Sequence, residues 1–96
     1  ALNKITIKSK YPVPVMEDLM DRLGGAKYFT RIDLRSGYHQ IRVAPEDIAK
    51  TTFRTRYGSY EWNVMGFGLT GAPGTFCQEM NDGFRDMLDE FLIIYI

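Results

Sequence analysis

Asp33 is the residue whose type and position best fit chemistry at a metal ion or a phosphate. It lies near the end of residues 28–34, an aromatic and β-branched stretch that is typical of a β-strand. Residues 35–37 are turn-forming, and residues 38–43 predict a second short strand. Carboxylate oxygens suit hard divalent cations, and free amides in a turn can bind phosphate oxygens. Two interpretations stay open on this pattern alone: a metal and phosphate site, or an aspartate that caps a strand end.

A glycine-rich stretch, residues 66–74, precedes the strongest helical pattern of the chain. It is not a phosphate-binding P-loop, because no Gly-Lys-Ser/Thr follows it. Pro73 suits the first turn of a helix. Apolar residues then recur at helical spacing: Phe76, Met80, Phe84, Met87 and Leu88. The pattern predicts a helix over residues 72–88.

The remaining elements are expected to be short. Residues 2–10 alternate loosely and predict an extended segment, whereas residues 16–23 carry an amphipathic helical pattern that ends at two glycines. Residues 50–56 and 60–65 predict a β-hairpin, and residues 91–96 read as a buried strand. We expect an α+β fold in which a short antiparallel sheet carries Asp33 and the C-terminal strand and is backed by the 72–88 helix.

Composition places the chain among ordinary globular proteins. It has 96 residues, enough for at most one small domain, and 12 basic residues balance 12 acidic ones. Basic side chains gather near the start and again at Lys50, Arg54 and Arg56, whereas acids gather late. The single histidine has no partner at metal-ligand spacing and the single cysteine, Cys77, cannot form an internal disulfide, so a zinc site and a disulfide framework are both excluded.

The run Phe-Thr-Arg-Ile-Asp-Leu-Arg-Ser-Gly-Tyr-His-Gln-Ile at residues 29–41 resembles motif A of a reverse transcriptase, in the form found in gypsy-class LTR retrotransposons. Further pieces match in the same order: residues 2–4, 11–14, 23–26, 50–55 and 67–73. The resemblance covers nearly the whole chain. It implies that residues 1–96 form a partial reverse transcriptase domain, with part of the fingers and a palm that holds motifs A and B.

By this resemblance Asp33 bridges two catalytic Mg²⁺ (or Mn²⁺) ions, and the carbonyl oxygen of Leu34 helps to hold one of them. Residues 91–96 resemble the lead-in to the family's Tyr-x-Asp-Asp motif, with Tyr95 and Ile96 as its first two residues. The two aspartates would come next. Because one carboxylate cannot hold two cations, we expect this chain alone to be a catalytically inactive fragment.

The resemblance also implies how a nucleotide would be held. Amides of Ser36 and Gly37 would bind triphosphate oxygens, and Tyr38 would lie beneath the sugar and exclude a 2′-hydroxyl. Phe67 would contact the nucleotide, and Gly68 would contact the template. The sequence departs from the family pattern where glycine replaces an expected proline, asparagine and alanine: Gly66, Gly71 and Gly74. These changes indicate a divergent or decayed copy.

The first functional hypothesis is part of an RNA-directed DNA polymerase that copies retrotransposon RNA into DNA by two-metal nucleotidyl transfer. Its partners would be an RNA template, a DNA primer, dNTPs and the rest of a Pol polyprotein, with no membrane. It would act in cytoplasmic virus-like particles or in the nucleus. The alternative is a decayed, non-catalytic remnant with a residual nucleic-acid-binding surface. A third hypothesis, an unrelated magnesium-dependent hydrolase that uses Asp33 with Asp47, explains none of the ordered motifs. Host, oligomeric state and a pararetroviral origin stay open.

Overall fold

The computed structural model describes all 96 residues, and its longest element is helix α3 (Ala72–Gly83). Gly71 caps the helix in the left-handed conformation, with φ at 83°, and proline follows in the first turn. The apolar stripe turns four residues of this helix inward: Ala72, Gly74, Phe76 and Cys77. The helix ends at Gly83, earlier than the predicted residue 88, and turns follow it. The early end reflects the low helix propensity of glycine.

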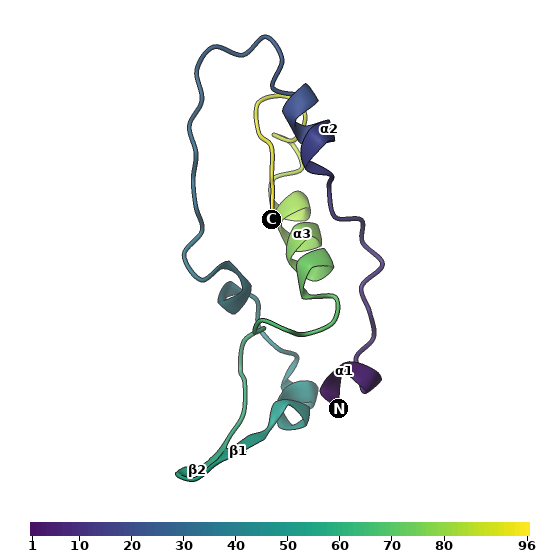
Figure 1. The fold of residues 1–96 in the computed structure, drawn as a ribbon, viewed down its shortest axis with the longest axis vertical. Helices are drawn as coiled ribbons and strands as arrows, with labels where there is room; N and C mark the ends of the chain where they lie inside the picture. The colour runs from purple at the N-terminus through teal and green to yellow at the C-terminus, as the bar shows by residue number, and fades with distance from the viewer.

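The other elements lie around α3 in an elongated molecule of 54 × 25 × 22 Å (Figure 1). In chain order they are the helices α1 (Leu2–Ile5) and α2 (Met16–Asp21), the 3₁₀ helices η1 (Gly37–Gln40) and η2 (Pro45–Thr51), and the strands β1 (Phe53–Thr55) and β2 (Gly58–Tyr60). The N-terminal chain runs along one side of α3 and residues 26–36 run along the other (Figure 1). The C-terminal segment returns beside α3.

Strands β1 and β2 form an antiparallel hairpin with Phe53 opposite Tyr60. The hairpin predicted from the sequence is therefore confirmed, although its strands are shorter than expected. It is the only sheet of the structure, and it projects from one end of the molecule (Figure 1). The mixed α and β character is confirmed, but the sheet does not carry Asp33.

Three predicted strands are absent. Residues 28–34 and 91–96 run without a ladder partner, apart from one isolated bridge that ends at Leu92. In the predicted strand 38–43, residues 37–40 instead form η1, and only Arg42 bridges to Val64. A strand needs a hydrogen-bonded neighbour, and these segments face cavities or solvent instead. The extended segment predicted for residues 2–10 is also wrong at its beginning, because residues 2–5 form helix α1.

Little of the chain is buried. Met65, Ala72 and Phe76 form the core cluster, against which Tyr38 and Ile96 pack among other half-buried residues. Only 6 of 96 residues are buried, and the accessible surface is 8267 Å². A compact monomer of this mass exposes about 5,700 Å². The excess, with exposed apolar residues such as Ile7 and Tyr28, leaves the core too small for a firmly stable unit.

We therefore expect the isolated 96-residue chain to unfold without a strong cooperative transition. Its free energy of unfolding should lie below about 5 kcal/mol, the lower end for whole domains. Urea unfolding followed by the fluorescence of Trp62, the only tryptophan, measures this directly. A steep transition with a larger free energy of unfolding would contradict the expectation.

Candidate functional site

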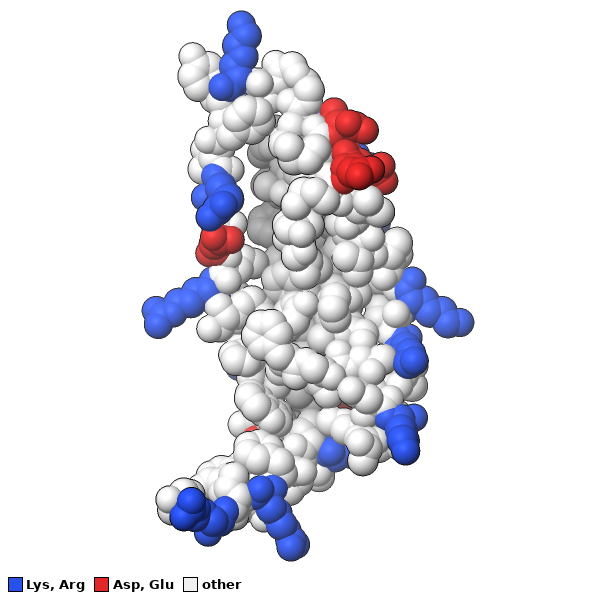
Figure 2. Space-filling model, viewed as in Figure 1, with Lys and Arg blue, Asp and Glu red and all other residues white.

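An open cavity of about 430 Å³ brings together three segments that lie far apart in the sequence. One wall comes from residues 32–38, a second from α3 with Phe67, and a third from residues 92–96. Figure 2 shows the surface hollowed between the left-hand segment and the body of the molecule. The lining is almost wholly apolar, and Asp33 is its one acidic residue. The cavity therefore places the predicted metal ligand beside the C-terminal segment, without a sheet between them.

Asp33 is open to solvent at the rim of this cavity. Its side chain is 86% exposed, and Arg31 contacts it through Nη2 and Oδ2 at 3.3 Å. An ion pair between two exposed side chains is weak, so Arg31 does not block the carboxylate. Leu34 follows it and also lines the cavity. The two predicted metal ligands are thus adjacent and accessible.

The turn after Asp33 is built by local hydrogen bonds. Gln40 Nε2 donates to the carbonyl of Arg35 at 2.8 Å, and the His39 amide donates to the carbonyl of Ser36 at 2.9 Å. The amides of Ser36 and Gly37 come before the His39 amide, which donates the first backbone hydrogen bond of the turn. Ser36 adopts the left-handed conformation, with φ at 50°. Neither amide donates a backbone hydrogen bond, so both N–H groups are left to bind an anion.

Gly37 lies directly against Phe76 of α3. A Cβ at residue 37 would lie 3.1 Å from the Cζ atom of Phe76, closer than ordinary van der Waals contact. Tyr38 packs next to the same ring, with ring centroids 5.5 Å apart and an edge-on geometry. Residues 37 and 38 are therefore packed on helix α3 through one phenylalanine.

Tyr38 also contacts Phe67, the predicted nucleotide-contacting residue, with ring centroids 4.9 Å apart. Phe67 is itself 83% exposed and lines the cavity. Gly68 follows in the left-handed conformation, with φ at 86° and open space around its Cα. The structure thus places Tyr38 and Phe67 on the cavity that Asp33 lines, with Gly68 next in the chain.

Three aromatic residues that the sequence analysis did not assign to the site extend this cluster: His39, Trp62 and Phe53. His39 stacks on Trp62 at 5.7 Å and meets the edge of Phe67 at 6.4 Å. Phe53 then links Trp62 to the hairpin at 6.2 Å. A continuous row of rings therefore joins the hairpin to the cavity. The four aromatic residues within positions 53–62, Phe53, Tyr57, Tyr60 and Trp62, were the sequence signal for it.

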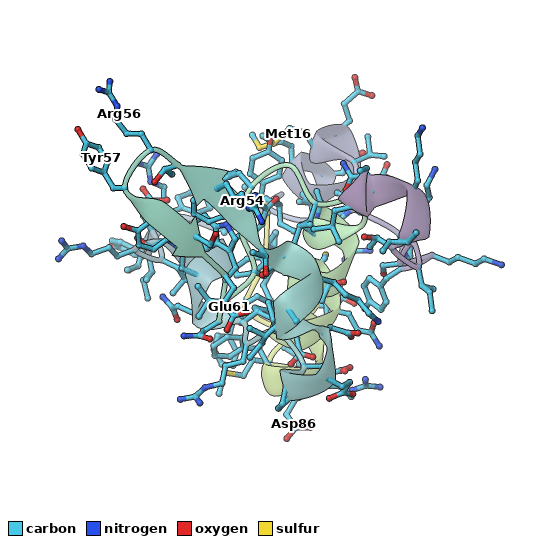
Figure 3. All side chains as sticks on the ribbon, turned by 90° about the horizontal axis from the view of Figure 1, so that it is seen from below. Met16, Arg54, Arg56, Tyr57, Glu61 and Asp86 are labelled. Carbon is cyan, nitrogen blue, oxygen red and sulfur yellow. The ribbon has the colours of Figure 1, made fainter.

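Charge is separated along the long axis. On the face drawn in Figure 2, acidic side chains gather over α2, whereas the opposite end shows mainly basic side chains. Three acids also belong to that end: Glu46 and Asp47 in η2, and Glu61 directly after β2 (Figure 3). At that end Arg56 and Tyr57 project from the tip of the hairpin (Figure 3), with the guanidinium 5.5 Å from the ring centroid of Tyr57. Neither Arg54 nor Arg56 forms an ion pair. The hairpin end is therefore the surface best suited to phosphate.

The acidic residues do not assemble a complete metal site. No group of three or more His, Cys, Asp or Glu side chains could hold an ion. Asp33 and the Leu34 carbonyl offer the oxygen atoms that Mg²⁺ prefers, but too few for two ions. Asp47 lies at another cavity, next to Lys50, whose amine it contacts at 2.7 Å. That placement contradicts an Asp33–Asp47 hydrolase pair.

The comparison with known proteins identifies the family of the chain. The sequence profile of the reverse transcriptase (RNA-dependent DNA polymerase) family matches residues 1–96. The chain belongs to the reverse transcriptase family. The resemblance drawn from motif A is thereby confirmed over the full chain, and the sequence similarity extends well beyond that motif.

Curated relatives support the same assignment to the reverse transcriptase family. An RNA-directed DNA polymerase homolog of Oenothera berteroana is 55% identical over the whole chain, which covers 68% of that protein. The Pol polyproteins of the Drosophila melanogaster transposons 297 and gypsy are 45% and 39% identical over 95 residues. The chain spans only 9% of each of these two polyproteins. The similarity to the gypsy polyprotein agrees with the gypsy-class motif.

None of the helices has the length and apolar character needed to span a bilayer.

Proposed function

We propose that this chain supplies part of the palm and fingers of a retroelement's RNA-directed DNA polymerase. The observation that carries the proposal is the single cavity lined by Asp33, Tyr38 and Phe67, in a chain that matches the family from end to end. Its substrates would be dNTPs, an RNA template and a DNA primer. The rest of a Pol polyprotein would supply the groups that this chain lacks.

In this proposal Asp33 and the Leu34 carbonyl hold their share of a divalent-ion site, with Mg²⁺ or Mn²⁺ as the ion. When bound, such ions activate the attacking hydroxyl and neutralise charge on the phosphates. Asp33 is suited to this role because its carboxylate is exposed and paired only with the exposed Arg31. Additional carboxylates are required, since no group of three or more acidic, His or Cys side chains in the structure could hold a metal ion.

The nucleotide would be positioned by groups that already lie around the cavity. The Ser36 and Gly37 amides would donate to triphosphate oxygens at the turn. The Tyr38 ring would form the floor beneath the sugar, because Phe67 and Phe76 hold it from two sides. Phe67 would contact the base or sugar, and Gly68 would allow the template backbone to approach closely.

A metal titration tests the first part of this proposal. Isothermal titration with Mn²⁺ should give millimolar or weaker binding for the 96-residue chain. A longer chain, in which Asp-Asp and enough residues to complete the fold follow Ile96, should bind at least about tenfold more tightly, since added carboxylates complete the ligand set. Asp33→Asn in the longer chain is the matched control and should remove the gain. Equal affinity in all three proteins would show that Asp33 belongs to no shared metal site.

The hairpin supports a second candidate, a non-catalytic remnant that binds nucleic acid. Its unpaired Arg54 and Arg56 and its exposed aromatic rings suit phosphate and base stacking. RNA-templated primer extension by the longer protein separates the two functions. Extension that depends on the divalent ion supports the polymerase, whereas binding of the primer and template without extension supports the remnant.

A further inference from the structure

One N-terminal side chain holds the backbone of the motif B loop, residues 66–74. Asn3 Nδ2 donates to the Gly68 carbonyl at 2.9 Å, and Asn3 Oδ1 accepts from the Thr70 amide at 2.8 Å. These bonds join residues 65 and 67 positions apart in the sequence. A single amide group therefore uses both its donor and its acceptor on the two sides of Leu69.

The N-terminal strap, residues 1–11, touches the same loop at its far end. A Cβ at Gly71 would lie 2.7 Å from the backbone nitrogen of Ser9, and a Cβ at Gly74 would lie 3.0 Å from Ser9 Oγ. Such distances leave no room for a side chain at Gly71 unless the strap moves. Two of the three glycines that depart from the family pattern, Gly71 and Gly74, therefore lie against the strap.

The loop has few other restraints. Its internal backbone hydrogen bonds lie at its end, where Ala72 bonds to Leu69 at 3.1 Å and Thr75 bonds to Gly71 at 2.9 Å. Gly68 and Gly71 both adopt positive φ. Glycine populates positive and negative φ about equally, so its own preference does not fix this conformation. Besides Asn3, the segment that carries Phe67 is held by its ring contacts to Tyr38 and His39 and by Leu69, which packs against the core cluster. Asn3 supplies the side-chain hydrogen bonds to the backbone of Gly68 and Thr70.

We propose that Asn3 is a positioning residue of the polymerase site, which fixes the Gly68–Thr70 backbone and through it the placement of Phe67 and Gly68 against nucleotide and template. This inference rests on the proposed function for its kinetic consequence. The clamp itself rests on the two hydrogen bonds alone. Asn3 does not touch the reacting groups, so its loss should loosen nucleotide binding more than it slows the chemical step.

The experiment uses a complete polymerase that contains this chain, with three single variants. Asn3→Ala removes both hydrogen bonds, and Asn3→Asp keeps the acceptor for Thr70 but loses the donor to Gly68. The matched control is Asn81→Ala, which breaks the 2.7 Å bond from Asn81 Nδ2 to Tyr11 Oη. It removes one contact between the strap and α3 and leaves both hydrogen bonds of Asn3 in place.

Asn3→Ala should raise the KM for dNTP about tenfold, as expected for two lost hydrogen bonds, with kcat within about threefold of wild type. The KM of Asn3→Asp should lie between those of wild type and Asn3→Ala. Asn81→Ala should change KM by less than about twofold. Amide exchange at Thr70, measured by NMR or mass spectrometry, should accelerate about tenfold or more in Asn3→Ala only.

Each contrary result has a distinct meaning. If Asn3→Ala and Asn81→Ala raise KM equally, the strap stabilises the fold only and the inference is overturned. Unchanged exchange at Thr70 in Asn3→Ala overturns the clamp itself. A wild-type protein that binds primer and template without extending them overturns the proposed polymerase function instead, and the Thr70 exchange still decides whether Asn3 holds the loop.

Discussion

Replacing Asp33 with asparagine should lower RNA-templated primer extension by a complete polymerase about a thousandfold or more. Asparagine keeps the shape of the side chain but removes the negative charge that a divalent ion requires, and the loss of such a ligand is worth several kcal/mol in the transition state. Asp33 is the only acid that lines the cavity, so no neighbour can replace it. Its exposure means that stability should change by less than about 0.5 kcal/mol. The measurement is kcat/KM for dNTP incorporation at fixed Mg²⁺.

Asp47→Asn is the matched control for this result. Asp47 is also an aspartate near an apolar cavity, but its partner is Lys50 and its cavity is a different one. The pKa of Lys50 is raised by its hydrogen bond to Asp47 and then by the charge of that residue. Loss of this exposed pair should cost little activity. If Asp33→Asn retained a tenth of the wild-type rate, or if both variants fell equally, Asp33 would not be the metal ligand.

Removing the ring of Tyr38 should open the site to ribonucleotides. Tyr38→Ala should lower the discrimination between dNTP and rNTP by about a hundredfold or more, because a steric clash with the 2′-hydroxyl disappears. Tyr38→Phe should keep nearly all of that discrimination, since rejection by clash depends on size and not on the phenol hydroxyl. In the structure the Tyr38 ring contacts the rings of both Phe67 and Phe76.

The ratio of kcat/KM for dNTP over rNTP is the required measurement, because Tyr38 also packs against the core cluster. Tyr38→Ala should lower stability as well as selectivity, and both substrates would suffer equally from a loosened core. The ratio cancels that common loss. An unchanged ratio with two reduced rates would make Tyr38 a purely structural residue and the steric-gate assignment wrong.

Local elements were the part of the fold that the sequence could predict. Each of these elements depends on residues that are close in the sequence. Helix α2 follows from its apolar period, the hairpin from its short turn, and the start of α3 from Pro73 shortly after Gly71. The predicted strands failed because a strand also needs a partner, and apolar residues at 28–34 and 91–96 do not specify one. In the structure these segments border a cavity instead.

The candidate site residues were named from the sequence for a different reason. Asp33, Tyr38 and Phe67 were placed by the order and spacing of family motifs, not by periodicity, and the structure brings them to one cavity. Asn3 was missed as a contributor because nothing in an asparagine near the start of a chain indicates a partner 65 residues away. Its hydrogen bonds depend on the tertiary arrangement of the strap and the loop.

The uneven distribution of acidic and basic side chains seen along the 54 Å axis in Figure 2 gives this chain an electric dipole although its net charge is zero. In the field of a polyanion, such a dipole experiences a torque that turns the hairpin end toward the nucleic acid and the α2 end away from it. Orientation would then precede contact, and it would act over a Debye length of about 8 Å at physiological ionic strength. Salt would weaken this alignment first and leave the ring contacts at the cavity, which are short-ranged, almost unaffected.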